Sequence, residues 1–326
     1  MTITLETVQS AARVVRGRIH RTPLIPSASL SRMTGHDLWL KAENLQKTGC
    51  FKPRGALNRL SKLSAAERAR GVLAASAGNH AQGLAFAAAD ARIPVTVVMP
   101  ANAQPSKIAA TRATGAEVIL HGTVFDEALA RALELRETTG KVFVHPCTDP
   151  DVVSGAGTIG LEILEDLPGV DAIVAPIGGG GLTSGLAVAV KEQPQGRRVR
   201  IFGVEPEGAP SMKRSLEAGR RVVLDSARSI ADGMTGRAVF DETLEYARRY
   251  LDDVVLVSDE AILRAMTLML TRCKMLAEGA GAGPVAAALE GLPALPPGSK
   301  VVAVVSGGNQ DLDLLARWLS KGLPTA

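Results

Sequence analysis

Short runs of β-branched residues alternate with helix-forming segments along most of this 326-residue chain. Such alternation is typical of parallel sheets that helices cover on both faces, so it predicts an α/β fold. Nine candidate strands are many for one simple sheet, which favours two α/β units that share a cleft. We expect strands over residues 38–42, 72–75, 95–99, 117–120, 142–145, 172–175, 199–204, 254–257 and 301–305. We expect helices over residues 81–90, 106–114, 126–139, 159–166, 183–192, 259–274 and 312–319.

Composition excludes several classes of partner and compartment. Aromatic residues make up only 3% of the chain, and its 37 Lys and Arg residues occur in short groups, so no nucleic-acid surface is predicted. Apolar stretches fall short of about 18 residues, and the N-terminus has no continuous apolar core, so neither a membrane span nor a signal peptide is expected. The three cysteines are widely spaced and form no CxxC pair. We therefore expect a cytoplasmic protein.

Four consecutive glycines, Gly178–Gly181, follow one predicted strand and open the next predicted helix. Without a Cβ atom, glycine reaches positive φ and can turn successive N–H groups toward one concavity. A helix N-terminus behind that concavity favours an anion, most naturally a phosphate. No Gly-Lys-Ser/Thr follows, so a P-loop NTPase is not predicted. The alternative is a flexible turn, for which four glycines are more than a tight strand-to-helix turn needs.

A second glycine run, Gly155–Gly160, matches the dinucleotide fingerprint G-x-G-x-x-G. That interpretation needs a strand directly before the run and an acidic residue about 20 residues later. Here Pro146, Asp149 and Pro150 separate the run from the preceding strand, and the tetraglycine stands where the acid should be. Close helix packing is therefore the favoured use of these glycines, and a nucleotide-binding oxidoreductase stays a remote alternative.

Lys52 stands directly before Pro53, a residue that favours the first turn of a helix. The positive end of a helix dipole disfavours a protonated amine, and Schiff-base chemistry needs an unprotonated lysine. Lys52 is therefore a candidate catalytic residue. From this segment alone, an ordinary surface lysine is an equally open alternative.

Two further segments place polar residues where predicted strands end. Ser76 and Asn79 follow the strand at 72–75, and Ser306 follows the strand at 301–305. Ligands of α/β sheets bind at the carboxyl ends of strands, so these positions suit a substrate carboxylate and a cofactor. An ordinary helix cap at the first segment and an ordinary turn at the second are the alternatives.

Taken in order, these four segments resemble the serine/threonine dehydratase family, from Arg21–Leu24 to Asn309. The members of that family are pyridoxal-phosphate enzymes with the fold of the tryptophan synthase β subunit, fold type II. The resemblance implies two doubly wound α/β domains with mostly parallel sheets and the cofactor in the cleft. Residues 1–65 and 145–326 would form a large cofactor-binding domain, and residues 66–144 a small mobile domain.

The resemblance also implies roles for individual residues. Lys52 would bind the cofactor covalently and act as catalytic base, with Phe51 beside it. Asn79 would bond the 3′ oxygen of the ring, and Ser306 would face the pyridine nitrogen. The phosphate would be held by Gly178, Gly179, Gly180, Gly181 and Leu182. The substrate carboxylate would be held by Ser76, Ala77, Gly78, Asn79 and His80.

The implied activity is β-elimination of a β-hydroxy amino acid, L-threonine or L-serine, to a 2-oxo acid and ammonia. A serine racemase, or a lyase for 3-hydroxyaspartate or phenylserine, is the alternative. Racemases of the family use a second serine where this chain has Ala77, which argues against racemisation.

Three further expectations come from the resemblance. The cation site of some relatives matches Glu205 and Ala209 but has Ser211 at its third position, so a monovalent or divalent cation is left open. Only 20 residues follow Ser306, so we expect a short form without the regulatory domain of biosynthetic relatives. Relatives are dimers or tetramers, so we expect a homodimer or homotetramer.

Overall fold

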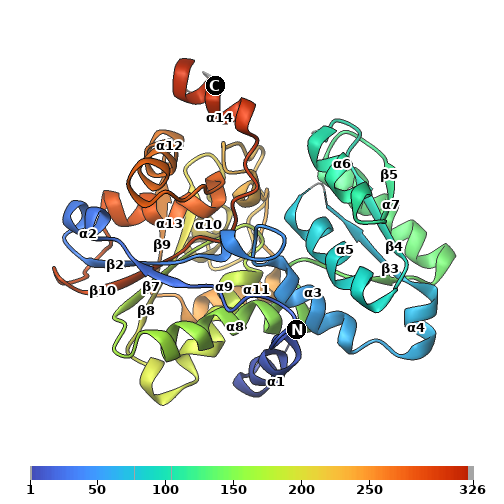
Figure 1. Ribbon diagram of the computed structural model, residues 1–326, viewed down its shortest axis with the longest axis horizontal. Helices are drawn as coiled ribbons and strands as arrows, with labels where there is room; N and C mark the ends of the chain where they lie inside the picture. The colour runs from blue at the N-terminus through green and yellow to red at the C-terminus, as the bar shows by residue number, and fades with distance from the viewer. Residues whose placement is uncertain (1, 77, 104, 322–326) are drawn as a thin grey trace.

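The computed structural model describes residues 2–76, 78–103 and 105–321, which form two β-sheets surrounded by helices (Figure 1). The six-stranded sheet has the order β1-β2-β10-β7-β8-β9, and the four-stranded sheet has the order β5-β4-β3-β6. All strands pair in parallel except β1, which runs antiparallel to β2. The fold is therefore α/β with mostly parallel, doubly wound sheets, as predicted.

The elements follow one another as strands and connecting helices. The strands are β1 (Leu24–Pro26), β2 (Asp37–Lys41), β3 (Val72–Ala75), β4 (Val95–Met99), β5 (Glu117–Leu120), β6 (Val142–Phe143), β7 (Ala172–Pro176), β8 (Arg200–Pro206), β9 (Asp253–Val257) and β10 (Lys300–Val304). The α-helices are α1 (Leu5–Val15), α2 (Ala28–Thr34), α3 (Lys52–Ser61), α4 (Ala65–Arg70), α5 (Asn79–Ala91), α6 (Pro105–Ala113), α7 (Phe125–Thr139), α8 (Pro150–Asp166), α9 (Gly181–Lys191), α10 (Ser211–Glu217), α11 (Asp241–Tyr250), α12 (Asp259–Leu268), α13 (Gly279–Glu290) and α14 (Leu312–Lys321). Short turns of other helices are η1 (Glu43–Leu45), η2 (Pro194–Gly196), η3 (Asp232–Met234) and the π-helical η4 (Met269–Cys273).

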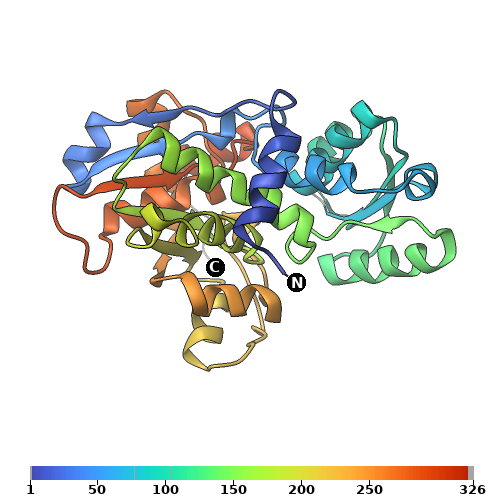
Figure 2. The ribbon, with the colours of Figure 1, turned by 90° about the horizontal axis from the view of Figure 1, so that it is seen from below.

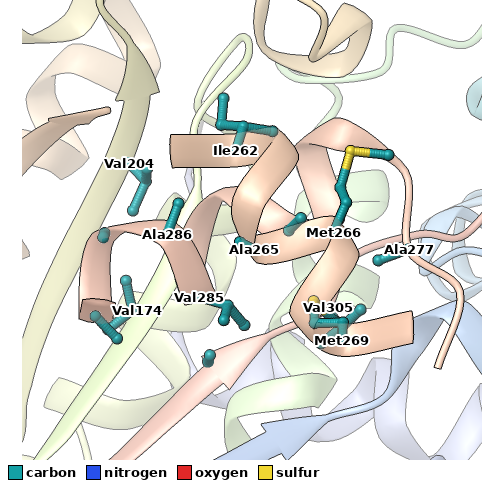
Figure 3. Packing of buried hydrophobic residues seen from close by; sticks show 14 of the residues in the cluster. Val174, Val204, Ile262, Ala265, Met266, Met269, Ala277, Val285, Ala286 and Val305 are labelled. Carbon is teal, nitrogen blue, oxygen red and sulfur yellow. The ribbon is translucent and has the colours of Figure 1, made fainter. Parts of the chain in front are cut away.

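Alternate residues of the six-stranded sheet enter two separate cores. Val174 of β7 and Val204 of β8 belong to the core beneath α12 and α13, whereas Ile173 of β7 and Ile201 of β8 belong to the core beneath α8 and α9. Figure 3 shows the first of these cores, where side chains of α12 and α13 pack against strand residues. Because both faces are buried, the strands are apolar throughout, as expected for a parallel sheet.

The four-stranded sheet is also covered on both faces. Val72 and Val97 pack in one core with α3 and α5, and Leu73 and Val98 pack in another with α7. This unit, coloured cyan to green, lies to one side of the remaining chain in both views (Figure 1, Figure 2). All four of its strands fall within residues 66–144. The division into a large and a small mobile domain stays a prediction.

The structure departs from the expected elements where residue type conceals the conformation. Helix α8 begins at Pro150, nine residues before the predicted start, because Asp149 caps it and its glycines lower the apparent helix propensity. The predicted helix at 259–274 divides into α12 and the π-helical η4, which ends at Lys274 with φ 56°. Strand β1 and several helices, α13 among them, were not predicted; α13 contains Pro284 and three glycines. Across the described ranges, no helix combines the length and hydropathy needed to cross a membrane.

The glycines of the G-x-G-x-x-G run lie inside α8 and serve helix packing, as predicted. A Cβ atom at Gly155 would lie 2.4 Å from the carbonyl oxygen of Arg54 on α3. One at Gly157 would lie 2.6 Å from the carbonyl oxygen of Gly185 on α9. Both distances are too short for real Cβ contacts, so α8 can approach these two helices only through glycine. No strand directly precedes the run, which removes the dinucleotide interpretation.

A buried ionic cluster fixes the first turn of α3. The guanidinium of Arg54 donates from Nε and Nη2 to the two carboxylate oxygens of Glu43, both at 2.8 Å. Its Nη1 donates to Oε1 of Glu162 on α8 at 2.7 Å, and Lys41 Nζ donates to Oε2 of Glu162 at 2.6 Å. The carboxylates compensate the charge of the buried guanidinium. The cluster therefore ties α3, which begins at Lys52, to β2 and α8.

Candidate active site

A cavity of about 700 Å³ lies at the carboxyl ends of β3, β7 and β10, where ligands of α/β sheets bind. The structure brings together in its walls nearly all of the predicted site residues. These are Phe51, Lys52, Ser76, Gly78, Asn79, His80, Gly178, Gly179, Gly180, Gly181, Leu182 and Ser306. Ala77 lies outside the described residues, and Glu205 does not line this cavity.

Lys52 is the first residue of α3, and Pro53 follows it within the first turn, as the sequence predicted. Its Nζ atom lies 4.8 Å from the ring centroid of Phe51. Helix α5 packs directly on the backbone here, since a Cβ atom at Gly83 would lie 2.8 Å from Cβ of Lys52. Gly83 was not among the predicted site residues, yet it permits the close approach that fixes Lys52.

The glycine loop connects β7 to α9, and its conformation differs in part from the expected one. Only Gly180 has positive φ, at 86°. Gly178, Gly179 and Gly181 are required by packing, because a Cβ atom would lie 2.3 Å from the Gly233 carbonyl oxygen, 2.5 Å from Sγ of Cys147 and 2.9 Å from Cα of Cys147, respectively. The glycines thus let neighbouring segments close in on the loop.

The N-terminus of α9 faces the cavity with its first N–H groups. Helix α9 starts at Gly181 and receives no side-chain cap, and its first turn holds no acidic residue. The hydroxyls of Thr183 and Ser184 both donate to the carbonyl oxygen of Gly180, which leaves the N–H groups of the first turn uncapped. Such an end is suited to an anion.

Helix α5 offers a second uncapped N-terminus. It begins at Asn79 after Gly78, whose N–H donates to Oγ of Ser76 at 3.2 Å. Nε2 of His80 lies 2.9 Å from the carbonyl oxygen of Val144, so this nitrogen carries the proton. Burial lowers the pKa of His80 to about 3, so the ring is neutral. His80 can therefore serve an anion through its main-chain N–H but not as a cation.

Ser306 follows β10 and is fastened to the segment that carries Lys52. Its carbonyl oxygen accepts a hydrogen bond from the N–H of Phe51 at 3.1 Å, and Cys50 pairs with Gly307 in an antiparallel bridge. Ser306 is buried and lines the cavity. The lysine and the strand-end hydroxyl are thus held in one local unit.

Several cavity residues were not predicted from the sequence. Glu278 is buried beside Asn79, and burial raises its pKa. Nζ of Lys107 on α6 forms an ion pair at 2.9 Å with Asp232 on η3, which links the two sheets' units across the cavity. Phe125 and Cys147 also line the walls. The stretches around Asp232 and Glu278 look like family segments, but no local pattern assigns them a role.

Glu205 has a structural task outside the cavity. Its carboxylate accepts hydrogen bonds from the N–H groups of Met212 and Lys213, at 2.7 and 2.9 Å, and from the hydroxyl of Ser211 at 3.2 Å. Burial raises the pKa of Glu205 to about 7. The described part of the chain holds no cluster of three His, Cys, Asp or Glu residues that could bind a metal ion. A cation at Glu205 stays a prediction.

Comparison with known proteins identifies the family. A family model described as pyridoxal-phosphate dependent enzyme matches residues 15–307. The L-threonine ammonia-lyase of Thermotoga maritima is 50% identical over 98% of this chain and 79% of that protein. Maize serine racemase superposes with a TM-score of 0.93 at 36% identity over 98% of each chain. A threonine deaminase from the organism abbreviated T.th. superposes with a TM-score of 0.88 at 43% identity over 94% of this chain and 99% of that one. These matches confirm the predicted resemblance: the chain belongs to the family of pyridoxal-phosphate dependent enzymes.

Proposed function

We propose that this enzyme removes water from a β-hydroxy amino acid, L-threonine or L-serine, and releases a 2-oxo acid and ammonia. The observation that carries the proposal is the single cavity that holds Lys52, two uncapped helix N-termini and the hydroxyl of Ser306. The relatives named for threonine ammonia-lyase and threonine deaminase support the same activity.

The residues of the cavity fit pyridoxal phosphate by chemistry and by size. A volume of about 700 Å³ accommodates a cofactor together with a small amino acid. The N–H groups of the loop Gly178–Leu182 would bind its phosphate, and the amine of Lys52 would hold its aldehyde carbon. Ser306 would face the pyridine nitrogen, and Asn79 would bond the 3′ oxygen.

When bound, the cofactor supplies an electron sink that makes the Cα proton of an attached amino acid removable. Lys52, freed by the incoming substrate amine, would take that proton on Nζ. The N–H groups of Asn79 and His80 at the start of α5 would bind the substrate carboxylate, with Ser76 and Gly78 beside them. A neutral hydroxyl at Ser306, unlike a carboxylate, would not hold the pyridine nitrogen protonated, which favours prompt loss of the β-hydroxyl.

The test begins with the purified protein. We expect a visible absorbance band that borohydride abolishes and that the Lys52→Ala variant lacks. A colourless protein that takes up no pyridoxal phosphate would overturn the proposal. Ammonia release over a panel of threonine, serine, 3-hydroxyaspartate and phenylserine then identifies the substrate.

A racemase is the second candidate, because maize serine racemase shares the fold at a TM-score of 0.93. The alanine at position 77 argues against it, since this side chain cannot act as a base on the face opposite Lys52. Chiral analysis of serine after incubation decides between the two. Inversion faster than release of the 2-oxo acid would replace the lyase by the racemase.

Three further properties belong to the proposal. The three free cysteines support work in a reducing compartment, the cytoplasm. A homodimer or homotetramer follows from the family alone and is measured by light scattering on the eluting protein. A small domain of residues 66–144 that moves over the cavity is supported by its separate sheet, and a cation dependence is tested by adding K⁺ or Mg²⁺ to chelated enzyme.

A further inference from the structure

A directed chain of hydrogen bonds lies behind Asn79. Nδ2 of Asn309 donates to the carbonyl oxygen of Thr48 at 2.9 Å and to Oδ1 of Asn79 at 2.8 Å. Nδ2 of Asn79 in turn donates to Oε1 of Glu278 at 2.6 Å. The chain thus connects the loop before Lys52, the segment after β10, the start of α5 and the start of α13.

The partners fix the orientation of each amide. The carbonyl oxygen of Thr48 can only accept, so Asn309 must turn its nitrogen toward it, and both protons of that nitrogen are then in use. Asn79 must therefore present its oxygen to Asn309 and its nitrogen to Glu278. One N–H of Asn79 is committed to Glu278, and the other is left for the cavity that Asn79 lines.

The surroundings leave room for this chain only through two glycines. A Cβ atom at Gly307 would lie 2.4 Å from Oε1 of Glu278. A Cβ atom at Gly49 would also lie 2.4 Å from Oδ1 of Asn309. The main-chain N–H of Glu278 donates to the carbonyl oxygen of Gly307 at 3.1 Å, which holds the acid against the loop of Ser306. Glu278 and Asn309 are therefore tightly enclosed and have one orientation.

We propose that Glu278 and Asn309 are positioning residues that hold the amide of Asn79 with its second N–H directed at the 3′ oxygen of the cofactor. The inference rests on the proposed function, because it assumes that pyridoxal phosphate occupies the cavity. Asn79 lies on the unit of the four-stranded sheet, whereas Glu278 and Asn309 lie on the other unit. The chain therefore also sets the position of α5 relative to the ring.

The test is a double-mutant cycle on the holoenzyme, read by the dissociation constant for pyridoxal phosphate in equilibrium dialysis and by the visible absorbance band. Glu278→Ala and Asn309→Asp should each raise the dissociation constant by about tenfold and shift the band, since each removes a hydrogen bond that orients Asn79. Asn309→Asp keeps the shape but loses both donors. Glu278→Gln keeps an acceptor of the same shape and should stay within about threefold of the wild type. Gln310→Ala is the control, because this neighbour of Asn309 does not contact Asn79.

In the Asn79→Ala background the same substitutions should change the dissociation constant by less than about twofold, because their effect passes through Asn79. Full effects in that background, or unchanged values in the wild-type background, would overturn the inference. If Glu278→Ala fails to fold, the Asn309→Asp cycle gives the same decision. A wild-type protein that binds no pyridoxal phosphate would instead refute the proposed function, so the two failures are distinguishable.

Discussion

Gly155→Ala tests whether helix packing, rather than ligand binding, explains the glycine run of α8. The added Cβ atom would lie 2.4 Å from the carbonyl oxygen of Arg54 and 2.5 Å from Cα of Gly55. Ordinary contact begins at 3.4 Å, so the first distance is short by 3.4 − 2.4 = 1.0 Å. Both neighbours are backbone atoms of α3 and cannot rotate away. We therefore expect α3 to move by about 1 Å relative to α8.

The displacement has a cost in stability and a larger one in activity. Overpacking costs about 1–3 kcal/mol, and the better helix propensity of alanine offsets about 1 kcal/mol of that loss. The net change in the free energy of unfolding is then a loss of up to about 2 kcal/mol. Lys52 begins α3, two residues before Arg54, so its amine moves with the helix. A misplacement of about 1 Å at a reacting group lowers kcat/KM by about a hundredfold.

Two assays measure these effects. Urea denaturation gives the midpoint of unfolding, and ammonia release from L-threonine at saturating pyridoxal phosphate gives kcat/KM. Glu165→Ala is the matched control on the same helix, because its side chain is 65% exposed and should leave both values nearly unchanged. A Gly155→Ala enzyme with wild-type stability and activity would refute the packing argument.

Three further substitutions probe other parts of the structure. Glu43→Gln leaves the buried guanidinium of Arg54 without one of its carboxylates and should lower the free energy of unfolding by about 3–5 kcal/mol, measured by urea denaturation. His80→Gln should reduce the pH dependence of stability: burial lowers the pKa of His80 from 6.5 to about 3, so the unfolded state binds the extra proton and wild-type stability falls as pH falls through this window. Thermal midpoints of both proteins between pH 4 and 7 test this, and parallel curves would contradict it. Asp232→Asn breaks the ion pair with Lys107 at the cavity, and because Asp232 is 70% exposed we expect KM to rise less than about fivefold, with no difference left in 0.5 M salt.

Much of the fold is predictable because short-range patterns determine it. The strands at 72–75, 95–99 and 117–120 have the expected bounds, since buried parallel strands are continuous apolar runs. Helix α13 escaped because glycine and proline conceal a helix whose small residues are selected for burial against the sheet. Local propensity cannot report a conformation that tertiary packing imposes.

The site divides in the same way. Lys52, Gly178–Gly181 and Ser306 stand beside elements whose ends the sequence marks, so their convergence at one edge follows from topology. Glu278 and Asn309 could not be assigned roles, because their meaning lies in hydrogen bonds to Asn79, which is about 200 residues away in sequence. The conformation of the glycine loop was partly wrong for the same reason: Cys147 and Gly233, which require its glycines, come from other segments.

Helix α3 packs against α5 of one unit and α8 of the other, with Gly83 and Gly155 at the two contacts. Any rotation of the four-stranded unit about this helix would carry the start of α5 and its anion-binding N–H groups through an arc toward the loop of α9. The amine of Lys52, at the pivot, would travel least. The molecule therefore places its reactive group on the axle and its gripping groups on the rim, so that grasping and releasing a substrate need not disturb the atom on which the chemistry depends.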